Sequence, residues 1–241
     1  MERKFMKNQS YYLQRAAQFN LLADFYKYMN PALHIQYYQK HLEYLNKAML
    51  QSRSGNRLNP VYVRFLNATK EIANIDIYTN GRMLIKELPF SNITPYYTLH
   101  AGKHHLDIYP AGTQTATIIN KNIGFETNRA YTLATVSTND KIQILSYEDL
   151  PTSSSQETKV KFIHLTSDYP SVNVFFKNKK VLFENIGYKK SSDYTSIERI
   201  TTNIEVVDRE TDKVIQTLEN ADFSTAKTFS IFFVDSQILL I

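Results

Sequence analysis

A long internal repeat is the feature of this sequence that most restricts its fold. Residues 63–69, Val-Arg-Phe-Leu-Asn-Ala-Thr, match residues 160–166, Val-Lys-Phe-Ile-His-Leu-Thr, at an offset of 97. The offset becomes 98 further along the chain, where Tyr96 matches Tyr194. An offset this constant over many apolar positions indicates a duplicated domain. The chain has 241 residues, which is room for two domains of about 100 residues with a core each.

Short runs in which apolar and polar residues alternate predict strands in each repeat. In the first copy these runs are residues 61–66, 75–78, 83–85, 96–99, 105–109, 116–119, 130–134 and 142–145. Asn80-Gly81 lies between two of them and is a strong signal for a tight hairpin. Short strands at intervals of about 8–12 residues predict an antiparallel β-sandwich, of immunoglobulin or transthyretin type, in each copy.

The second copy keeps the order of the runs but loses glycines from its turns. Lys177-Asn178-Lys179 replaces Asn80-Gly81-Arg82, and Asp208-Arg209-Glu210-Thr211 replaces Pro110-Ala111-Gly112-Thr113. A short polar stretch, residues 151–158, is the predicted linker. The predicted fold is mainly β, with a helical hairpin over residues 1–57, a first sandwich over 58–150 and a second over 159–241.

Residues 1–57 have the composition of helices. No Gly or Pro interrupts the chain from Ser10 to Tyr28, and Leu, Ala, Gln and Phe are frequent there. Asn30-Pro31 predicts the start of a second helix, because Asn is a favoured N-cap and Pro is accepted at the first helical position. The polar residues 51–54 and Gly55 predict its end.

The second helix carries an apolar stripe with spacings of three and four residues. The stripe consists of Ile35, Tyr38, Leu42, Leu45 and Met49, and a second row beside it of Tyr37, His41, Tyr44 and Ala48. Two short helices cannot bury this much apolar surface against each other, so we expect the hairpin to dock on the β domains or on another subunit. The candidate interface residues are Ile35, Tyr37, Tyr38, Leu42, Tyr44, Leu45 and Met49.

The net charge of +5 is concentrated at the start of the chain. Residues 1–57 contain nine Lys and Arg and three Asp and Glu. The other 184 residues contain 19 Lys and Arg and 20 Asp and Glu. The basic residues are dispersed, which favours a solvated helix face over a nucleic-acid site. We find no membrane-length apolar segment and no signal peptide, so we expect a protein made in the cytoplasm and kept there. The alternative is a spore coat or surface protein released by lysis of the mother cell.

The first repeat resembles a known family in several motifs. They are Val63-Arg64-Phe65-Leu66-Asn67-Ala68, Ile75-Asp76-Ile77-Tyr78-Thr79-Asn80-Gly81, Leu88-Pro89-Phe90, Tyr96 and His105-Leu106-Asp107-Ile108-Tyr109-Pro110-Ala111-Gly112-Thr113. These motifs resemble the bacterial domain-of-unknown-function 4397 family, strongly over residues 61–150 and weakly over 159–241. The resemblance implies tandem copies in envelope or surface proteins, many of which are secreted. This chain differs in lacking a signal and in having a Tyr-rich helical leader.

No motif for catalysis or for a cofactor stands out. The chain has no Cys, and its His residues lack the spacing of a metal site, because His104 and His105 should point to opposite faces of a strand. Asp76 and Asp107 are expected at outward strand positions, where polar residues are ordinary. Gly-rich phosphate loops and nucleophile elbows are missing as well. We therefore expect no enzyme activity, no metal and no cofactor.

Three classes of function remain at this point, and the least favoured is an enzyme, which would require a cleft with at least two convergent ionisable groups. The first is a structural or interaction protein that assembles with itself or docks on another protein through its helical segment. The second is a module that binds polysaccharide or peptide through loops and exposed tyrosines, with Tyr96 and Tyr97 as candidates. The apolar C-terminal run, residues 229–241, is either a strand of its own domain or a strand donated to a neighbour.

Overall fold

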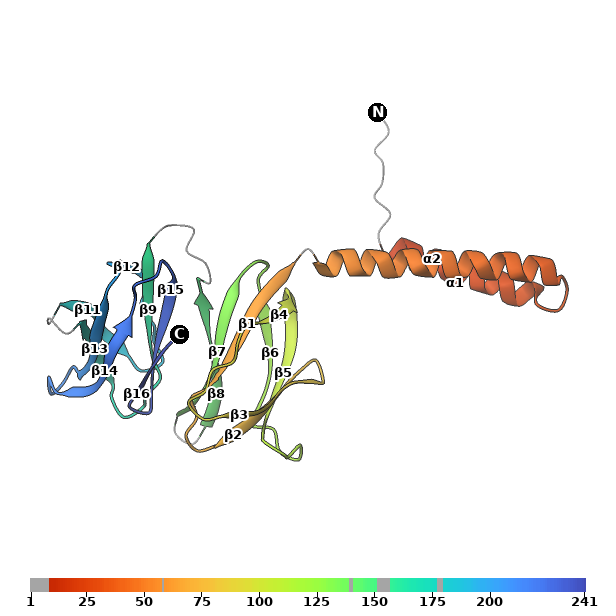
Figure 1. Cartoon of the computed structure of the whole chain (residues 1–241). Coiled ribbons are helices and arrows are strands. Elements are labelled where there is room, and N and C mark those ends of the chain that lie inside the picture. Colours follow the sequence, from red (N-terminus) through yellow and green to blue (C-terminus); the bar gives the residue numbers. More distant parts are fainter. Residues whose placement is uncertain (1–8, 58, 139–140, 151–156, 177–179) are drawn as a thin grey trace. The chain divides into compact units, whose positions relative to one another are not determined.

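The structure is a computed structural model that describes residues 9–57, 59–138, 141–150, 157–176 and 180–241. It divides into two compact units, Met1–Pro60 and Val61–Ile241. The first unit contains two helices packed on each other, α1 (Gln9–Tyr26) and α2 (Pro31–Arg57). The described residues of the second unit form sixteen strands in four small sheets (Figure 1). The predicted order, a helical hairpin followed by two β domains, is confirmed.

The turn between the helices has the predicted cap. Pro31 is the first residue of α2, and the backbone N–H of Leu33 donates to Asn30 Oδ1 at 3.2 Å. The predicted end of α2 at residues 51–55 is wrong, because the helix continues through Gly55 to Arg57. One glycine costs a helix about 1 kcal/mol relative to alanine, which a long helix tolerates. Among the described residues, neither helix is long and apolar enough to cross a membrane.

The first β repeat is a sandwich of two four-stranded sheets, β4-β1-β7-β8 and β3-β2-β5-β6. Its strands are β1 (Pro60–Asn67), β2 (Asn74–Thr79), β3 (Arg82–Pro89), β4 (Tyr97–His100), β5 (Gly102–Pro110), β6 (Ile119–Phe125), β7 (Ala130–Thr138) and β8 (Lys141–Asp149). Its core lies between the sheets and contains the alternate residues Val61, Val63 and Phe65 of β1. Strand alternation therefore places Arg64 and Leu66 on the outer face of the same sheet.

The second β repeat has the same topology, with sheets β12-β9-β15-β16 and β11-β10-β13-β14. Its strands are β9 (Thr158–His164), β10 (Ser171–Phe176), β11 (Val181–Gly187), β12 (Thr195–Ile197), β13 (Thr201–Asp208), β14 (Val214–Asp222), β15 (Thr228–Val234) and β16 (Gln237–Leu240). Its core contains Val160, Phe162, Phe223, Ile231 and Phe233. The internal repeat in the sequence is therefore a repeat of the fold.

Each repeat contains a parallel strand pair, β1 with β7 in the first and β9 with β15 in the second. The two strands of each parallel pair are far apart in sequence, as a parallel pair requires, because its connection must cross over. β16 pairs with β15 of its own domain, and Ser230 and Ile241 exchange both backbone hydrogen bonds. The C-terminal strand is thus part of its own sheet.

One turn of the second repeat lacks the glycine that its counterpart in the first repeat contains. Asn80 and Gly81 have φ of 51° and 74°, which suits the tight turn predicted between β2 and β3. Their counterparts, residues 177–179, lie outside the described residues. Gly112 has φ of 76°, whereas the matching turn of the second repeat uses Asp212 at φ 55°. There the Asp208 carboxylate accepts from Glu210 N–H and Thr211 Oγ1, so a side chain supports the turn without glycine.

Candidate interaction surface

Buried alanines lie at the contact between α1 and α2, and the two on α1 are seven positions apart. Ala16 and Ala23 on α1 are 3% and 0% exposed, and Ala48 on α2 is 1% exposed. Aromatic rings fill the space between these alanines. The Tyr37 ring stacks on Tyr26 with centroids 5.6 Å apart and on Phe19 at 6.3 Å. Such pairs contribute about 0.5–1.5 kcal/mol beyond their burial.

Two histidines of α2 join the helices through their rings. His34 Nδ1 lies 2.8 Å from the carbonyl oxygen of Ala23, and His41 Nδ1 lies 3.0 Å from that of Ala16. A carbonyl oxygen only accepts, so Nδ1 carries the proton in both rings. The seven-residue spacing of the histidines on α2 matches that of the alanines on α1, and this match is a signal that the sequence analysis missed.

The packed face of α2 is the second row of the sequence analysis, not the apolar stripe. His34, Tyr37, His41, Tyr44 and Ala48 form the seam with α1. The stripe is one position further along the chain, and each residue of a helix is rotated by about 100° from the one before it. It is therefore turned away from the seam. Within it, Ile35, Tyr38, Leu42 and Met49 are 55%, 46%, 41% and 51% exposed, and Leu45 is half-buried.

The candidate interface residues thus separate into two groups. Tyr37 and Tyr44 hold the hairpin together, whereas Ile35, Tyr38, Leu42, Leu45 and Met49 form what we call the open strip. Helix geometry makes this strip about 21 Å long, at about 1.5 Å per residue. No charged side chain belongs to it.

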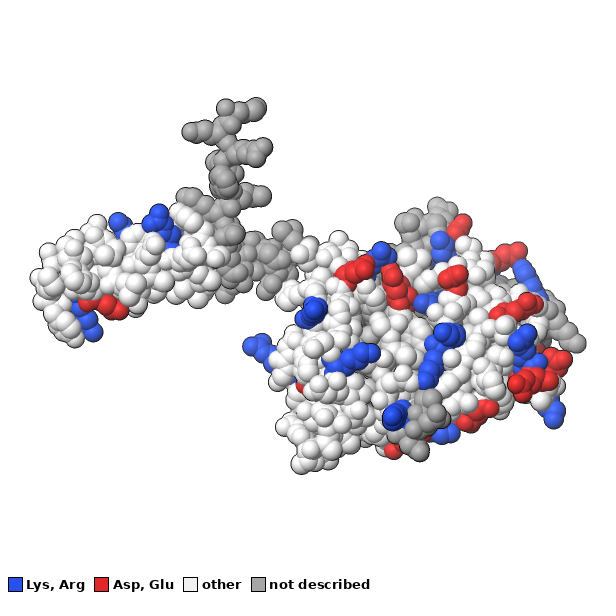
Figure 2. Space-filling view, turned by 180° about the vertical axis from the view of Figure 1, so that it is seen from behind, with Lys and Arg blue, Asp and Glu red and all other residues white. Residues whose placement is uncertain are grey.

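The opposite edge of the seam is covered by lysines. Lys40 Nζ lies 5.5 Å and 5.8 Å from the ring centroids of Phe19 and Tyr37, and Lys47 Nζ lies 5.1 Å from that of Tyr44. Lys47 also pairs with Glu43 one turn away. Lysine stems cover apolar surface while the ammonium groups stay in water. One edge of the hairpin is therefore polar and the other apolar. On the face drawn in Figure 2, most of the helical unit is uncharged.

Apolar exposure is concentrated on the hairpin. Among the described residues, 18 large apolar side chains are exposed, and ten of them belong to α1, α2 and their connection. Besides the four exposed residues of the open strip, they are Leu13, Leu21, Leu22, Phe25, Tyr28 and Met29. Exposed apolar residues that occur singly need no explanation, but a contiguous patch marks an interaction site.

The two β repeats contact each other through equivalent sheets. The outer faces of β1, β7 and β8 meet those of β9, β15 and β16 in one apolar cluster. Equivalent residues of both repeats belong to it, including Leu66 with Ile163 and Val136 with Val234. Each repeat therefore buries the outer face of one sheet against its copy, which explains why β1 and β9 are buried on both faces.

A buried ion pair lies beside this cluster. Arg64 Nε is 3.3 Å from Asp149 Oδ2 and donates to Thr132 Oγ1 at 2.8 Å, and Arg64 Nη2 donates to Ser230 Oγ of the second repeat at 3.1 Å. The side chains of Arg64 and Asp149 are 7% and 1% exposed. Charges this deeply buried are tolerated when they are paired and hydrogen-bonded.

Tyr96, a candidate ligand residue, belongs to the same network. Its hydroxyl donates to Asp149 Oδ2 at 2.8 Å, and its ring centroid lies 4.8 Å from Arg64 Cζ. Burial, and then the Asp149 charge, raise the pKa of Tyr96 far above its usual value. Tyr97, the second candidate, is half-buried and packs against the core of the first repeat. The two neighbouring rings thus have different surroundings and do not form one stacking surface.

The second repeat supplies matching residues to the same contact. Lys161 stands where the first repeat has Arg64, is 6% exposed, and donates to the carbonyl oxygen of Glu148 at 2.8 Å. Tyr194 corresponds to Tyr96, and its ring centroid lies 5.3 Å from Lys161 Nζ. Burial lowers the pKa of Lys161 and raises that of Tyr194. The correspondence of Lys161 with Arg64 and of Tyr194 with Tyr96 follows from the repeat in the sequence. A single sequence does not show which sheet faces of the two repeats contact each other.

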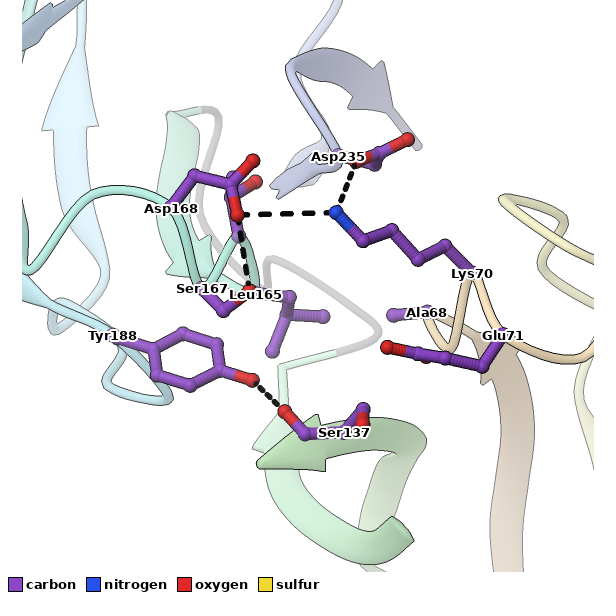
Figure 3. A pocket seen from close by; sticks show the side chains of 10 residues that line it. Ala68, Lys70, Glu71, Ser137, Leu165, Ser167, Asp168, Tyr188 and Asp235 are labelled. Carbon is purple, nitrogen blue, oxygen red and sulfur yellow. Dashed lines mark hydrogen bonds and ion pairs between the residues drawn. The ribbon is translucent and has the colours of Figure 1, made fainter. Parts of the chain in front are cut away.

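A small cavity lies at the rim between the repeats (Figure 3). Lys70 Nζ reaches across it to Asp168 at 3.8 Å and Asp235 at 3.5 Å, and the Tyr188 hydroxyl donates to the Ser137 carbonyl oxygen at 2.6 Å. Its volume is about 20 Å³. A space of this size accommodates about one water molecule, so it is no ligand pocket.

The carboxylates considered for catalysis have structural partners. Asp76 is buried, and its two oxygens accept from the N–H groups of Glu87 at 2.7 Å and Gly112 at 3.0 Å. Glu87 has φ of 53°, so the carboxylate supports a left-handed residue inside β3. Asn173 accepts from Asn185, also at φ 53°, in the second repeat. Within the described parts of the chain, no three His, Asp or Glu residues gather as metal ligands would.

Comparisons with known proteins identify the β unit and leave its function open. A search of curated proteins finds no match. The solved structures that are similar include three at low identity. The C-terminal domain of AlgF from P. aeruginosa is 11% identical over 38% of this chain and 99% of that one, with a TM-score of 0.30. The Bacillus anthracis TIE protein is 8% identical over 72% and 33%, with a TM-score of 0.25.

The third structure belongs to putative polysaccharide binding proteins (DUF1812) from Bacteroides thetaiotaomicron. It is 10% identical over 76% of this chain and 95% of that one, with a TM-score of 0.20. TM-scores this low carry no argument about function. The family model of the Domain of unknown function (DUF4397) matches residues 61–175 and 158–239. Since these matches span well over half of the sequence, the chain belongs to the DUF4397 family.

Proposed function

We propose that this protein is a non-catalytic structural component that assembles with itself through the helical hairpin. The observation that carries the proposal is the open strip, in which Ile35, Tyr38, Leu42 and Met49 are each more than 40% exposed. The hairpin needs none of them for its own packing, because α1 contacts the other row of α2. Burying this many apolar side chains against a partner lowers the free energy, because their surface is removed from water.

A second copy of the same strip is the partner that fits best. The strip has no charge, so a charged partner surface would be desolvated there without compensation. Two copies related by a two-fold axis bring identical apolar strips together, as in most homodimers. The lysines of the other edge remain in water in this arrangement, because Lys40 and Lys47 lie on the far side of the seam. The expected product is a four-helix bundle formed by two hairpins.

The test is the solution mass of the full-length protein by light scattering over a range of concentrations. The variant Ile35→Gln/Leu42→Gln/Met49→Gln keeps good helix formers in α2 and removes apolar surface from the strip. We expect a defined oligomer for the unchanged protein and a monomer for the variant.

The matched control is Leu21→Gln/Leu22→Gln/Phe25→Gln, which removes as many exposed apolar side chains from α1. It should keep the oligomer. A monomeric unchanged protein, or a triple variant of α2 that keeps its mass, would show that the strip is not an assembly surface.

A further inference from the structure

Each β repeat carries an open groove at the same position. The groove of the first repeat has a volume of about 530 Å³ and that of the second about 520 Å³. Residues at an offset of 98 line both. They are Arg82, Met83, Leu84, Thr98, Leu99 and His100 in the first groove and Lys180, Val181, Leu182, Ser196, Ile197 and Glu198 in the second. A hollow that recurs in both copies belongs to the fold and is no accident of one surface.

The grooves lie between free strand edges. β3 and β4 are each one of the two edge strands of their sheets in the first sandwich, and β11 and β12 are the equivalent edge strands in the second. Among the described residues, no strand pairs with the outer side of any of the four. An edge strand presents unpaired backbone N–H and C=O groups, which are a template for another extended chain.

The lining of both grooves suits an extended peptide. Met83 and Val181 are 47% and 43% exposed, while Leu84, Leu182, Leu99 and Ile197 are half-buried and form the floor. Thr98 and Ser196 add an exposed hydroxyl to each groove. A volume near 500 Å³ lies within the range of ligand sites, about 300–1,000 Å³. Backbone pairing at an edge combined with pockets for alternate side chains is the chemistry of strand addition.

We propose that these grooves bind extended apolar peptide segments of a partner protein by strand addition. The proposal does not depend on the assembly role of the hairpin, because it concerns strands of the β unit alone. The two grooves differ in charge. The lining of the first contains Arg82, His100 and His104 and no acidic residue, whereas the second sets Lys180 against Glu157 and Glu198. A segment that carries a carboxylate therefore prefers the first groove.

The experiment uses the full-length protein and a fluorescein-labelled peptide of alternating valine and threonine with one glutamate. Fluorescence anisotropy measures binding, and amide NMR shifts locate it. We expect saturable binding, with the largest shifts at Arg82–Leu84 and Thr98–His100. The same peptide with proline at alternate positions lacks the required N–H donors and should bind at least about tenfold more weakly.

Variants separate the two grooves. Thr98→Trp fills the first groove from an exposed position and should weaken binding of the glutamate peptide at least about tenfold, a loss of about 1.4 kcal/mol. Ser196→Trp should leave that affinity nearly unchanged. Lys121→Trp places the same side chain on β6, another edge strand, and is the matched control with unchanged affinity. Circular dichroism melts check that the variants fold.

Several results would overturn the proposal. They are no saturable binding up to about 1 mM peptide, equal binding of the proline peptide, or equal loss of affinity in the Lys121→Trp and Thr98→Trp variants. NMR shifts confined to other strands, or binding of an oligosaccharide but not of the peptide, would overturn it as well.

Discussion

The helical unit and the β unit differ in how much of their apolar side chains they bury. In the β unit, apolar residues from both faces of β1 and β9 are buried, one face in a sandwich core and the other between the repeats. In the hairpin, two helices share one narrow seam, and ten large apolar side chains remain exposed. Apolar side chains are thus mostly enclosed in the β unit and partly open to water in the hairpin. This difference supports the proposal that the hairpin, and not the β unit, carries the association surface.

Removal of residues 1–57 is the strongest way to break this comparison. The remaining β unit has three apolar clusters of its own, so we expect it to fold and melt at the same temperature as the β unit of the intact protein. The oligomer should disappear completely. Light scattering and thermal melts check both parts. If the intact and the shortened protein were monomers of equal thermal stability, the assembly role proposed for the hairpin would be wrong.

Asp149→Asn should affect only the β unit. The change leaves Arg64 buried without its ionic partner, which typically costs about 3–5 kcal/mol. We expect a lower free energy of unfolding in urea and an unchanged oligomeric mass. The matched control is Glu148→Gln, since exposed Glu148 pairs with Arg129 and exposed pairs contribute about 0–1 kcal/mol. Equal losses in the two variants would argue against a special role for the buried pair.

His41→Ala should have the converse effect. It removes the His41 donor from the carbonyl of Ala16, which keeps the N–H donor of its own helix, and it takes a ring out of the seam. The expected cost to the hairpin is about 0.5–1.5 kcal/mol for the hydrogen bond, in addition to the lost ring contacts. The helical signal in circular dichroism should melt earlier, while the β unit melts as before. His100→Ala, at an exposed position of β4, is the control and should change neither transition. An unchanged helical transition in His41→Ala would mean that the seam is held by its rings alone.

The smallest expected effect concerns alkaline pH. Burial raises the pKa of Tyr147, whose hydroxyl donates to the carbonyl of Lys189 at 3.0 Å. An unfolded tyrosine ionises near pH 10 while the folded one stays neutral, so this stability is complete below about pH 10 and is lost as pH rises toward the folded pKa. The slope is at most about 1.4 kcal/mol per pH unit for one group. Urea unfolding between about pH 9 and 11 should therefore show a shallower decline in Tyr147→Phe than in the unchanged protein, and Tyr62→Phe, at an exposed position, should match the unchanged protein.

Much of the fold was predictable because strand alternation and turn signals are local patterns and because the repeat is visible as a constant offset in the sequence. Asn30-Pro31 and Asn80-Gly81 are examples in which two residues determine a cap or a turn. The packed face of α2 was not predictable in the same way. Two rows with the same three-and-four spacing lie side by side there, and the less apolar one packs, because alanine permits close approach and histidine supplies donors.

The contact between the repeats was also missed, for a physical reason. β1 and β9 have apolar sequences because their outer faces are buried as well as their inner faces. The sequences do not show which part of the molecule covers the outer faces. Arg64 and Lys161 look like ordinary outward residues, and only the structure shows that both lie at a buried contact. The lining of the grooves was hidden for a similar reason, since it combines residues from edge strands of two different sheets.

The face-to-face contact of the two repeats also limits how such a chain can grow. Each repeat uses the equivalent sheet for this contact. Once the two repeats are packed together, the outer face of that sheet is covered in both of them. A third copy added to the chain would find no vacant sheet of that kind, unlike a solenoid, in which every repeat leaves a site for the next. This mode of packing therefore stops at two repeats. A larger assembly has to use surfaces other than the sheets in this contact.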